Sequence, residues 1–363
     1  MSRCLLTPFV LVAVLTPAFA QQPAASSKTL DAAERAAVID GVLDKITKNY
    51  VFPDVAKKME EAIRGRVANK EYDAVTSGQE FATKLTEHLR EVCKDKHLSV
   101  RFTPDPIPQS SASGPSAEDR KRFERFAVSK NYGFQKVEHL PGGVGYLDLR
   151  GFMDVGLIGE TAAAAMTFLS TADAVIFDMR QNNGGDPAAV ILLCSYLFDQ
   201  PTHLNDIYTR GTDSTRQYWS LPTVAGKKLV DKDVYVLTSK RTFSGAEEFA
   251  YNIQSQKRGT IVGETTGGGA HPTRGFRVTD HFMVGVPFAR SINPVTKTNW
   301  EGTGVKPDVG VPADQALHTA HLMALKKAAD KHKDDKPLAA DLKRETEKVQ
   351  KELDAMKAKA AAK

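Results

Sequence analysis

Between residues 144 and 263 the chain alternates short apolar runs with longer helix-like runs, and this alternation limits the possible folds more than any other feature. The short runs are rich in Val, Ile, Leu, Tyr and Phe, as β-strands are. Strands that alternate with helices predict an α/β core, which we place at residues 119–312. The strand-like runs are Gly145–Leu149, Ala174–Asp178, Val234–Leu237 and Thr260–Val262, and the helix-like runs are Thr161–Leu169, Ala188–Phe198 and Ala246–Gln256.

Residues 30–102, which precede this core, contain three amphipathic helix patterns and predict a small N-terminal helical domain. Apolar residues recur at helical spacing in each pattern, and Pro53 marks the start of the second. The domain ends in a strand-like alternation at Leu98–Phe102. Residues 103–118 are rich in Pro and Ser, which predicts a linker.

The first twenty residues have the pattern of a cleavable signal peptide. Arg3 supplies the positive start, Leu5–Leu15 is mostly apolar, and Ala18-Phe19-Ala20 is a small-x-small cleavage site. We expect cleavage after Ala20, a short leader over residues 21–29, and a periplasmic or secreted mature protein. No later run is long enough to span a membrane.

Residues 313–363 form a tail rich in Ala, Lys, Glu and Asp. Its apolar residues Leu342, Val349, Leu353 and Met356 recur at near-heptad spacing, which predicts a solvated helix with one docking stripe. A short coiled-coil contact between subunits is the alternative, so a homo-oligomer remains open.

The totals exclude some classes of function. The formal net charge is +5, and the basic excess is small and dispersed, so nothing indicates nucleic-acid binding. Beyond the signal peptide only Cys93 and Cys194 remain, which we interpret as two buried thiols or as a single bridge. We expect no cofactor and no metal, because no ligand cluster has metal-binding spacing.

The candidate nucleophile is Ser244, within Thr242–Ala250. It lies where the apolar run Val234–Leu237 gives way to a helix-like run. A serine at such a turn is typical of either a helix N-cap or a nucleophile facing the positive end of the helix. A second turn, between a strand and a helix, contains Gly184 and Gly185, whose N–H groups suit an oxyanion hole or a tight turn.

Ser244 needs a base, because a free hydroxyl is a poor nucleophile at neutral pH. Among nine histidines, His97 lies at the join of helical domain and strand, and His271 in a Gly-rich segment is its competitor. A histidine base needs an acceptor that fixes its tautomer. Glu301, between Trp300 and Gly302, is the candidate, although an exposed turn residue fits the same pattern.

Together these segments resemble the C-terminal-processing, or tail-specific, serine peptidase family. The motifs occur in the family's order and the resemblance covers about residues 30–312. It implies a crotonase/ClpP-like β–α core and a peptide or protein substrate. The matching segments are Asp178–Gly185, Thr242–Glu247, Ile261–Gly268 and Glu301–Asp308.

Two departures place the chain in one branch of that family. Processing peptidases use a Ser–Lys dyad, but residues 263–275 contain no Lys, and residues 103–140 are too few for the peptide-binding PDZ domain. Both features resemble the tricorn core protease and the modules of interphotoreceptor retinoid-binding protein. That resemblance implies a Ser244–His97–Glu301 arrangement, with an oxyanion hole from Gly184, Gly185 and Gly245. Lys96 stands where the tricorn core has a serine, and Lys240 is the alternative base.

The sequence therefore predicts an exported serine peptidase that hydrolyses peptide bonds through an acyl-enzyme. Two alternatives stay open. The same fold can hold apolar ligands without catalysis, as in retinoid-binding relatives, and the same machinery can serve an esterase or amidase on small acyl compounds.

Overall fold

The computed structural model describes residues 29–108 and 116–362. Its centre is a six-stranded sheet in which only the edge strand β2 runs antiparallel to its neighbour. The order across the sheet is β12 (Val309–Gly310), β8 (Thr260–Gly263), β7 (Asp233–Thr238), β4 (Ala174–Asp178), β3 (Val144–Leu149) and β2 (Phe134–Leu140). Because β3, β4, β7 and β8 are parallel, the loops that follow them all leave the same edge of the sheet.

Helices cover both faces of this sheet, as the alternation along β4 shows. Val175 and Phe177 pack into the cluster formed with α5 (Val155–Leu169), α6 (Pro187–Ser195) and α7 (Gly245–Ser255). Ala174 and Ile176 point the other way and pack against α8 (Ala316–Lys331). Successive strand residues face opposite sides, so these apolar runs are buried on both.

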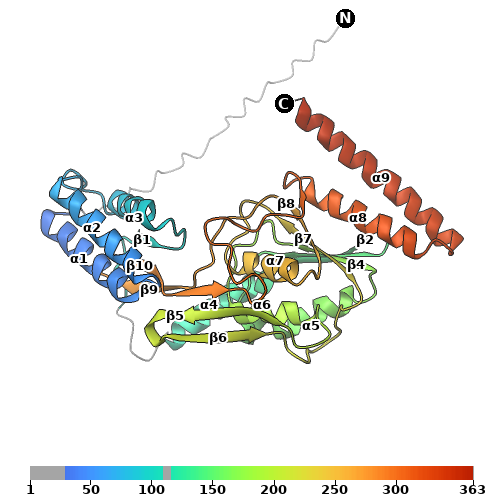
Figure 1. The fold of residues 1–363 in the computed structure, drawn as a ribbon, viewed down its shortest axis with the longest axis horizontal. Coiled ribbons are helices and arrows are strands. Elements are labelled where there is room, and N and C mark those ends of the chain that lie inside the picture. The colour runs from blue at the N-terminus through green and yellow to red at the C-terminus, as the bar shows by residue number, and fades with distance from the viewer. Residues whose placement is uncertain (1–28, 109–115, 363) are drawn as a thin grey trace, which may run out of the picture.

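The N-terminal helices α1 (Ala32–Asn49), α2 (Pro53–Ala68) and α3 (Gly78–Cys93) share a second core with a three-stranded sheet. Asp31 caps α1 in a capping box with Glu34, and Pro53 opens α2. The small sheet pairs β1 (Ser99–Phe102) with β10 (Phe282–Pro287), which pairs with β9 (Thr273–Arg277). A hairpin from late in the chain thus completes the N-terminal module, which lies at one end of the molecule (Figure 1).

A third sheet orders β11 (Ala289–Ile292), β5 (His203–Thr209) and β6 (Ser214–Trp219). Between β1 and β2 lie α4 (Ala117–Ser129) and the short helix η1 (Asn131–Gly133), and η2 (Arg210–Thr212) joins β5 to β6.

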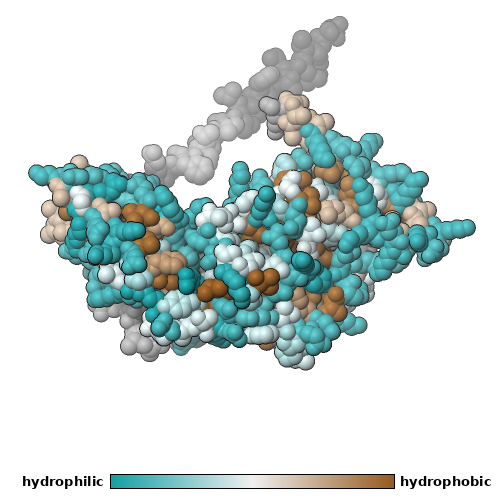
Figure 2. Space-filling view, viewed as in Figure 1, coloured by the Kyte–Doolittle hydropathy of each residue, from teal (hydrophilic) through white to brown (hydrophobic). Residues whose placement is uncertain are grey.

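The C-terminal tail is helical, and its apolar stripe docks within the chain. Leu342, Val349 and Leu353 of α9 (Lys336–Ala361) are buried against Leu322 and Leu325 of α8. Because α8 also covers the central sheet, it fixes the tail to the core. Hydrophilic side chains predominate on the face of the molecule shown in Figure 2.

The predicted fold class is confirmed: the chain has a mixed α/β core with N-terminal and C-terminal helices. Cys93 and Cys194 are both free thiols. No helix in residues 29–108 or 116–362 is long and apolar enough to cross a membrane. The predicted signal peptide lies outside the described residues.

Candidate active site

Three loops leave the carboxyl edge of the central sheet and meet at one place. The loop after β4 carries Gly184 and Gly185, the turn after β7 carries Ser244, and the loop after β8 carries Gly269. Their approach is close: a Cβ on Gly184 would lie 2.7 Å from the Ser244 Cβ and 2.5 Å from the Gly245 nitrogen. Only glycine leaves room for this contact, which joins two of the sequence motifs in space.

Ser244 has a strained backbone, with φ 54° and ψ −123°. This conformation is uncommon for a residue with a side chain and is typical of functional sites. It makes a sharp turn between β7 and α7, and a sharp turn from a strand to a helix presents the nucleophile in other serine hydrolases. Ser244 is also the N-cap of α7, but its backbone angles differ from the extended angles of an ordinary N-cap.

Glu247 holds this turn in place from inside the protein, where it is fully buried. Its Oε2 accepts hydrogen bonds from the N–H groups of Ser244 and Gly269, both at 2.9 Å. Its Oε1 accepts from Thr266 Oγ1 at 2.5 Å and the Gly268 N–H at 2.6 Å. Burial raises the pKa of Glu247, and these four donors oppose that rise.

Replacing Glu247 by alanine is expected to lower the free energy of unfolding by about 3–5 kcal/mol, because four donors, three of them in buried hydrogen bonds, lose their acceptor. Urea unfolding followed by circular dichroism measures this change. The matched control, Glu61→Ala on an exposed position of α2, should stay within about 0.5 kcal/mol of wild type. Equal effects of the two variants would contradict the bracing role of Glu247.

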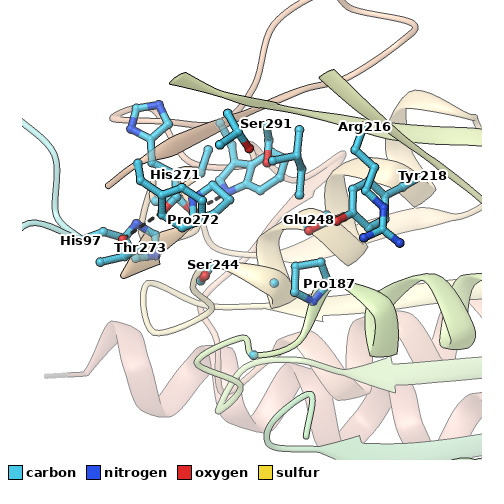
Figure 3. A pocket seen from close by; sticks show the side chains of 18 residues that line it. His97, Pro187, Arg216, Tyr218, Ser244, Glu248, His271, Pro272, Thr273 and Ser291 are labelled. Atoms are coloured by element: carbon cyan, nitrogen blue, oxygen red, sulfur yellow. Dashed lines mark hydrogen bonds between the residues drawn. The ribbon is translucent and has the colours of Figure 1, made fainter. Parts of the chain in front are cut away.

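The serine opens into a cavity of about 590 Å³ that is also lined by His97 and His271. Figure 3 shows Ser244 and His97 toward one side of this cavity and Glu248, Tyr218 and Arg216 toward the other. Lys240 lines a different cavity, with Asp178 and Glu264. Of the candidate bases, the two histidines therefore share the serine's cavity.

His97 lies on the turn between α3 and β1, and its ring packs on Phe243, the residue before Ser244, with centroids 4.7 Å apart. A Cβ on Gly269 would lie 2.6 Å from the His97 Cε1, so the glycine loop also borders the ring. Burial lowers the pKa of His97, with the charge of Asp95 opposing the shift. The imidazole is therefore neutral at neutral pH and able to accept a proton.

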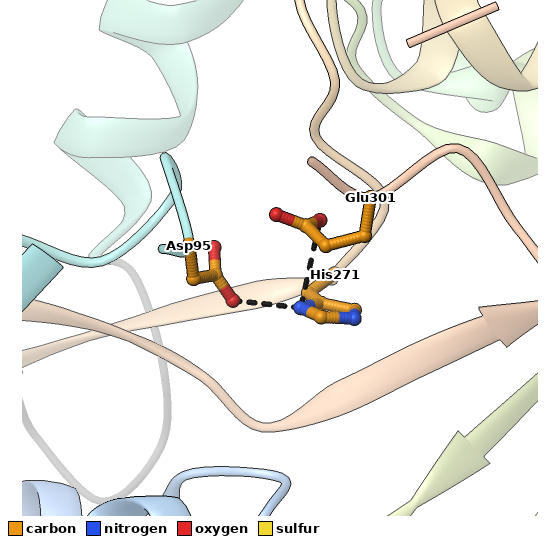
Figure 4. A group of neighbouring side chains, drawn as sticks. All are labelled: Asp95, His271 and Glu301. Carbon is orange, nitrogen blue, oxygen red and sulfur yellow. Dashed lines mark hydrogen bonds and ion pairs between the residues drawn. The ribbon is translucent and has the colours of Figure 1, made fainter. Parts of the chain in front are cut away.

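The structure joins Glu301 to His271 rather than to His97 (Figure 4). Glu301 Oε2 accepts a 2.5 Å hydrogen bond from the Ala270 N–H and lies 3.5 Å from His271 Nδ1. Burial and the charge of Asp95 raise the pKa of Glu301 to about 7. His97 Nδ1 and Glu301 Oε1 are among the buried side-chain atoms that have no hydrogen-bond partner within the described residues.

Asp95 is the site residue that sequence reasoning missed. It is 1% exposed, and its Oδ1 accepts the backbone N–H of His97 at 2.9 Å. Its Oδ2 binds His271 Nδ1 at 2.6 Å and accepts from Tyr50 Oη at 3.4 Å. Asp95 thus ties the His97 turn to the core, and an acid two residues before the histidine was the available signal.

Asp95, His271 and Glu301 are also close enough to hold a metal ion, with ligand atoms within 4.8 Å of one another. Two carboxylates and an imidazole are ligands that Zn²⁺ accepts. In this structure, however, Asp95 and His271 are joined directly by a hydrogen bond at Nδ1, the atom a metal would need. The cluster is therefore a histidine that is hydrogen-bonded to Asp95 and lies beside the Glu301 carboxylate.

The three glycines of the expected oxyanion hole are not equivalent. The Gly184 N–H donates to Asn182 Oδ1 at 2.8 Å. The N–H groups of Gly185 and Gly245 make no hydrogen bond within the described chain, and a Cβ on Gly245 would lie 3.1 Å from the Gly185 nitrogen. Both glycines line the cavity with Ser244, so these two N–H groups are available to a substrate oxygen.

Glu248 lies on the cavity wall and is buried, and burial raises its pKa to about 7. A carboxyl with a raised folded-state pKa stabilises the fold at low pH, and this contribution is lost as pH rises from about 4 to 7.

Glu248→Gln is therefore expected to reduce the fall in the free energy of unfolding between pH 5 and 8, by about 3 kcal/mol at most. Urea unfolding at pH 5, 6, 7 and 8 measures this free energy for wild type and variant. An equally steep fall with pH in Glu248→Gln would refute the raised pKa of Glu248.

Two family models match the chain. The model described as Peptidase family S41 matches residues 143–311, and the model described as the N-terminal domain of Peptidase_S41 in eukaryotic IRBP matches residues 30–126. The chain belongs to peptidase family S41. This confirms the resemblance to the C-terminal-processing peptidases.

Relatives and solved structures agree with this assignment. The chloroplastic carboxyl-terminal-processing peptidase 1 of Arabidopsis thaliana is 26% identical over 179 residues, which are 49% of this chain and 35% of that protein. The matching part thus spans about a third of that relative's length. A lipoprotein from Streptococcus agalactiae has a TM-score of 0.55 at 13% identity, covering 81% of this chain and 96% of that one. A peptidase-like protein from Parabacteroides merdae has a TM-score of 0.55 at 17% identity, covering 80% and 96%. These two structures show a similar fold.

Proposed function

We propose that this S41 family member is an exported serine peptidase in which Ser244 attacks the substrate carbonyl and His97 removes the serine proton. The observation that carries the proposal is the strained turn of Ser244, which opens into a cavity shared with a neutral, buried histidine. Acyl transfer needs a presented nucleophile and a neutral base, whereas a binding protein needs neither.

In the proposed reaction, the Nε2 of His97 takes the Ser244 proton as the Oγ–carbon bond forms. The N–H groups of Gly185 and Gly245 stabilise the negative oxygen, helped by the N-terminus of α7. His97 then protonates the leaving amine, and water hydrolyses the acyl-enzyme with His97 again as base. Gly184 contributes by its lack of a side chain, since its N–H is already bound to Asn182.

Glu301 is proposed to orient His97 in the reactive conformation. The unpartnered atoms His97 Nδ1 and Glu301 Oε1 both belong to side chains that border the Gly269–Ala270 loop. A direct contact or one bridging water would satisfy both atoms and fix the Nδ1–H tautomer. Lys96, which replaces the serine of the tricorn core, donates to the Gly267 carbonyl.

Export rests on the N-terminal sequence, with Arg3, the apolar Leu5–Leu15 run and the Ala18-Phe19-Ala20 cleavage site. The mature protein would begin at Gln21 and act in the periplasm or outside the cell.

Digestion of a peptide library by wild type and by Ser244→Ala tests the function. Peptide cleavage by wild type alone is the expected result, and mass spectrometry of the products gives the cleavage sites. Turnover of p-nitrophenyl esters without any peptide cleavage would favour the esterase alternative. Neither activity, with a folded protein that binds a fluorescent fatty acid, would favour the apolar-ligand alternative.

A further inference from the structure

Glu248 is a buried carboxylate in the candidate active-site cavity that the proposed reaction does not use. It follows Ser244 by four residues and so lies one turn along the same side of α7, a rise of about 6 Å. The side chain is 4% exposed, yet it lines the cavity together with Ser244. The Glu248 carboxylate is therefore held on the cavity wall at a fixed distance from Ser244, where a substrate can reach it.

Within the described residues Glu248 has a hydrogen bond but no ion pair. Its Oε1 accepts from Asn205 Nδ2 at 3.1 Å. Its charged neighbour is another acid, Asp186, which together with burial raises the pKa of Glu248. An ionised carboxylate that is buried without a cation is costly, and a cationic ligand would remove that cost.

The walls around Glu248 suit an aliphatic chain that ends in a charge. Ile207, Tyr218, Phe288 and Pro187 line the same cavity and supply apolar surface. Arg216 also lines it, but its side chain is exposed and its guanidinium lies over the Tyr218 ring at 5.0 Å. Lysine and arginine side chains bury their methylene stems along apolar surface and keep the charged end for a polar partner.

We propose that Glu248 forms the floor of a specificity subsite for a lysine or arginine side chain, belonging to the substrate residue whose carbonyl Ser244 attacks. The inference rests on the proposed peptidase function and adds the substrate class. The cation would bind the free Oε2 of Glu248, while Asn205 keeps Oε1 oriented. The stem would lie along Tyr218 and Ile207.

The test compares four fluorogenic peptide amides that differ only in the last residue, which is Lys, Arg, norleucine or Glu, at pH 8 where Glu248 is ionised. Wild type is expected to show a kcat/KM for Lys and Arg about tenfold or more above that for norleucine, the gain for pairing a desolvated charge. Glu248→Gln, which can still accept from Asn205, should reduce this ratio to about one. The exposed control Glu61→Gln should retain it.

Equal kcat/KM values for Lys and norleucine in wild type, or a preference for Glu, would overturn the subsite, and this comparison needs no variant. An unchanged preference in folded Glu248→Gln would overturn it as well. Cleavage of neutral peptides without a cation preference would refute the subsite and leave the peptidase function intact.

A second measurement does not depend on turnover. Binding of tetrapeptides that end in Lys or norleucine to Ser244→Ala, followed by calorimetry, should favour Lys by about tenfold. If wild type cleaves no substrate but Ser244→Ala binds Lys peptides preferentially, the peptidase function fails while the subsite stands. Equal binding of the two peptides would overturn the subsite.

Discussion

Ser244→Ala is expected to lower kcat/KM for peptide hydrolysis by at least about 10⁴-fold, because the variant loses the atom that forms the acyl-enzyme. The change removes a single hydroxyl from a half-buried side chain, so the fold should persist. The Ser244 backbone remains strained, and alanine accepts that strain about as poorly as serine does. The rate of cleavage of a peptide identified in the library measures the effect.

The control for this prediction is Ser129→Ala, at an exposed position at the end of α4 that does not line the cavity of Ser244. Its activity should match wild type. Residual activity of Ser244→Ala within tenfold of wild type, with circular dichroism unchanged, would show that another group attacks the substrate.

His97→Ala is expected to lower kcat/KM by about 10³-fold or more, because the variant loses the proposed base, a buried neutral imidazole that packs on the residue before Ser244. Burial lowers the pKa of His97, so wild-type activity should also persist below pH 6.5, the usual histidine value. Activity should fall only where the imidazole becomes protonated. A pH profile of kcat/KM measures this shift.

His271→Ala and Lys240→Ala separate the competing bases. His271→Ala breaks the contact with Asp95 that ties the His97 turn to the core, so a smaller loss of about 10–100-fold is expected. Lys240 lines another cavity and its replacement should change little. Activity that survives His97→Ala but is lost in His271→Ala or Lys240→Ala would move the role of base to that residue.

The parts of this molecule that local sequence patterns control were predictable. The strands near Ala174–Asp178 and Val234–Leu237 are buried on both faces, so they read as continuous apolar runs. The turn at Ser244 lies directly between such a strand and a helix, and its motif is contiguous. Family resemblance added the order of motifs that lie far apart in the sequence.

The parts that depend on distant pairing were not predictable from one sequence. The β9–β10 hairpin joins the N-terminal module because β10 pairs with β1, across about 180 residues of chain. The hydrogen bond between Asp95 and His271 was unpredictable for the same reason, because the sequence around a single acid does not indicate which distant residue it will contact. The spacing of Leu342, Val349 and Leu353 predicted a helix with an apolar stripe. It did not predict that this stripe packs against α8.

The most direct test of Ser244 as the nucleophile is reaction of the folded protein with a fluorophosphonate, followed by mass spectrometry of the intact chain and of its peptides. One covalent adduct per chain is expected, located on Ser244, absent from Ser244→Ala and formed much more slowly in His97→Ala. A folded wild-type protein that stays unlabelled, or that carries the adduct on another residue, would contradict the assignment of Ser244 as the nucleophile.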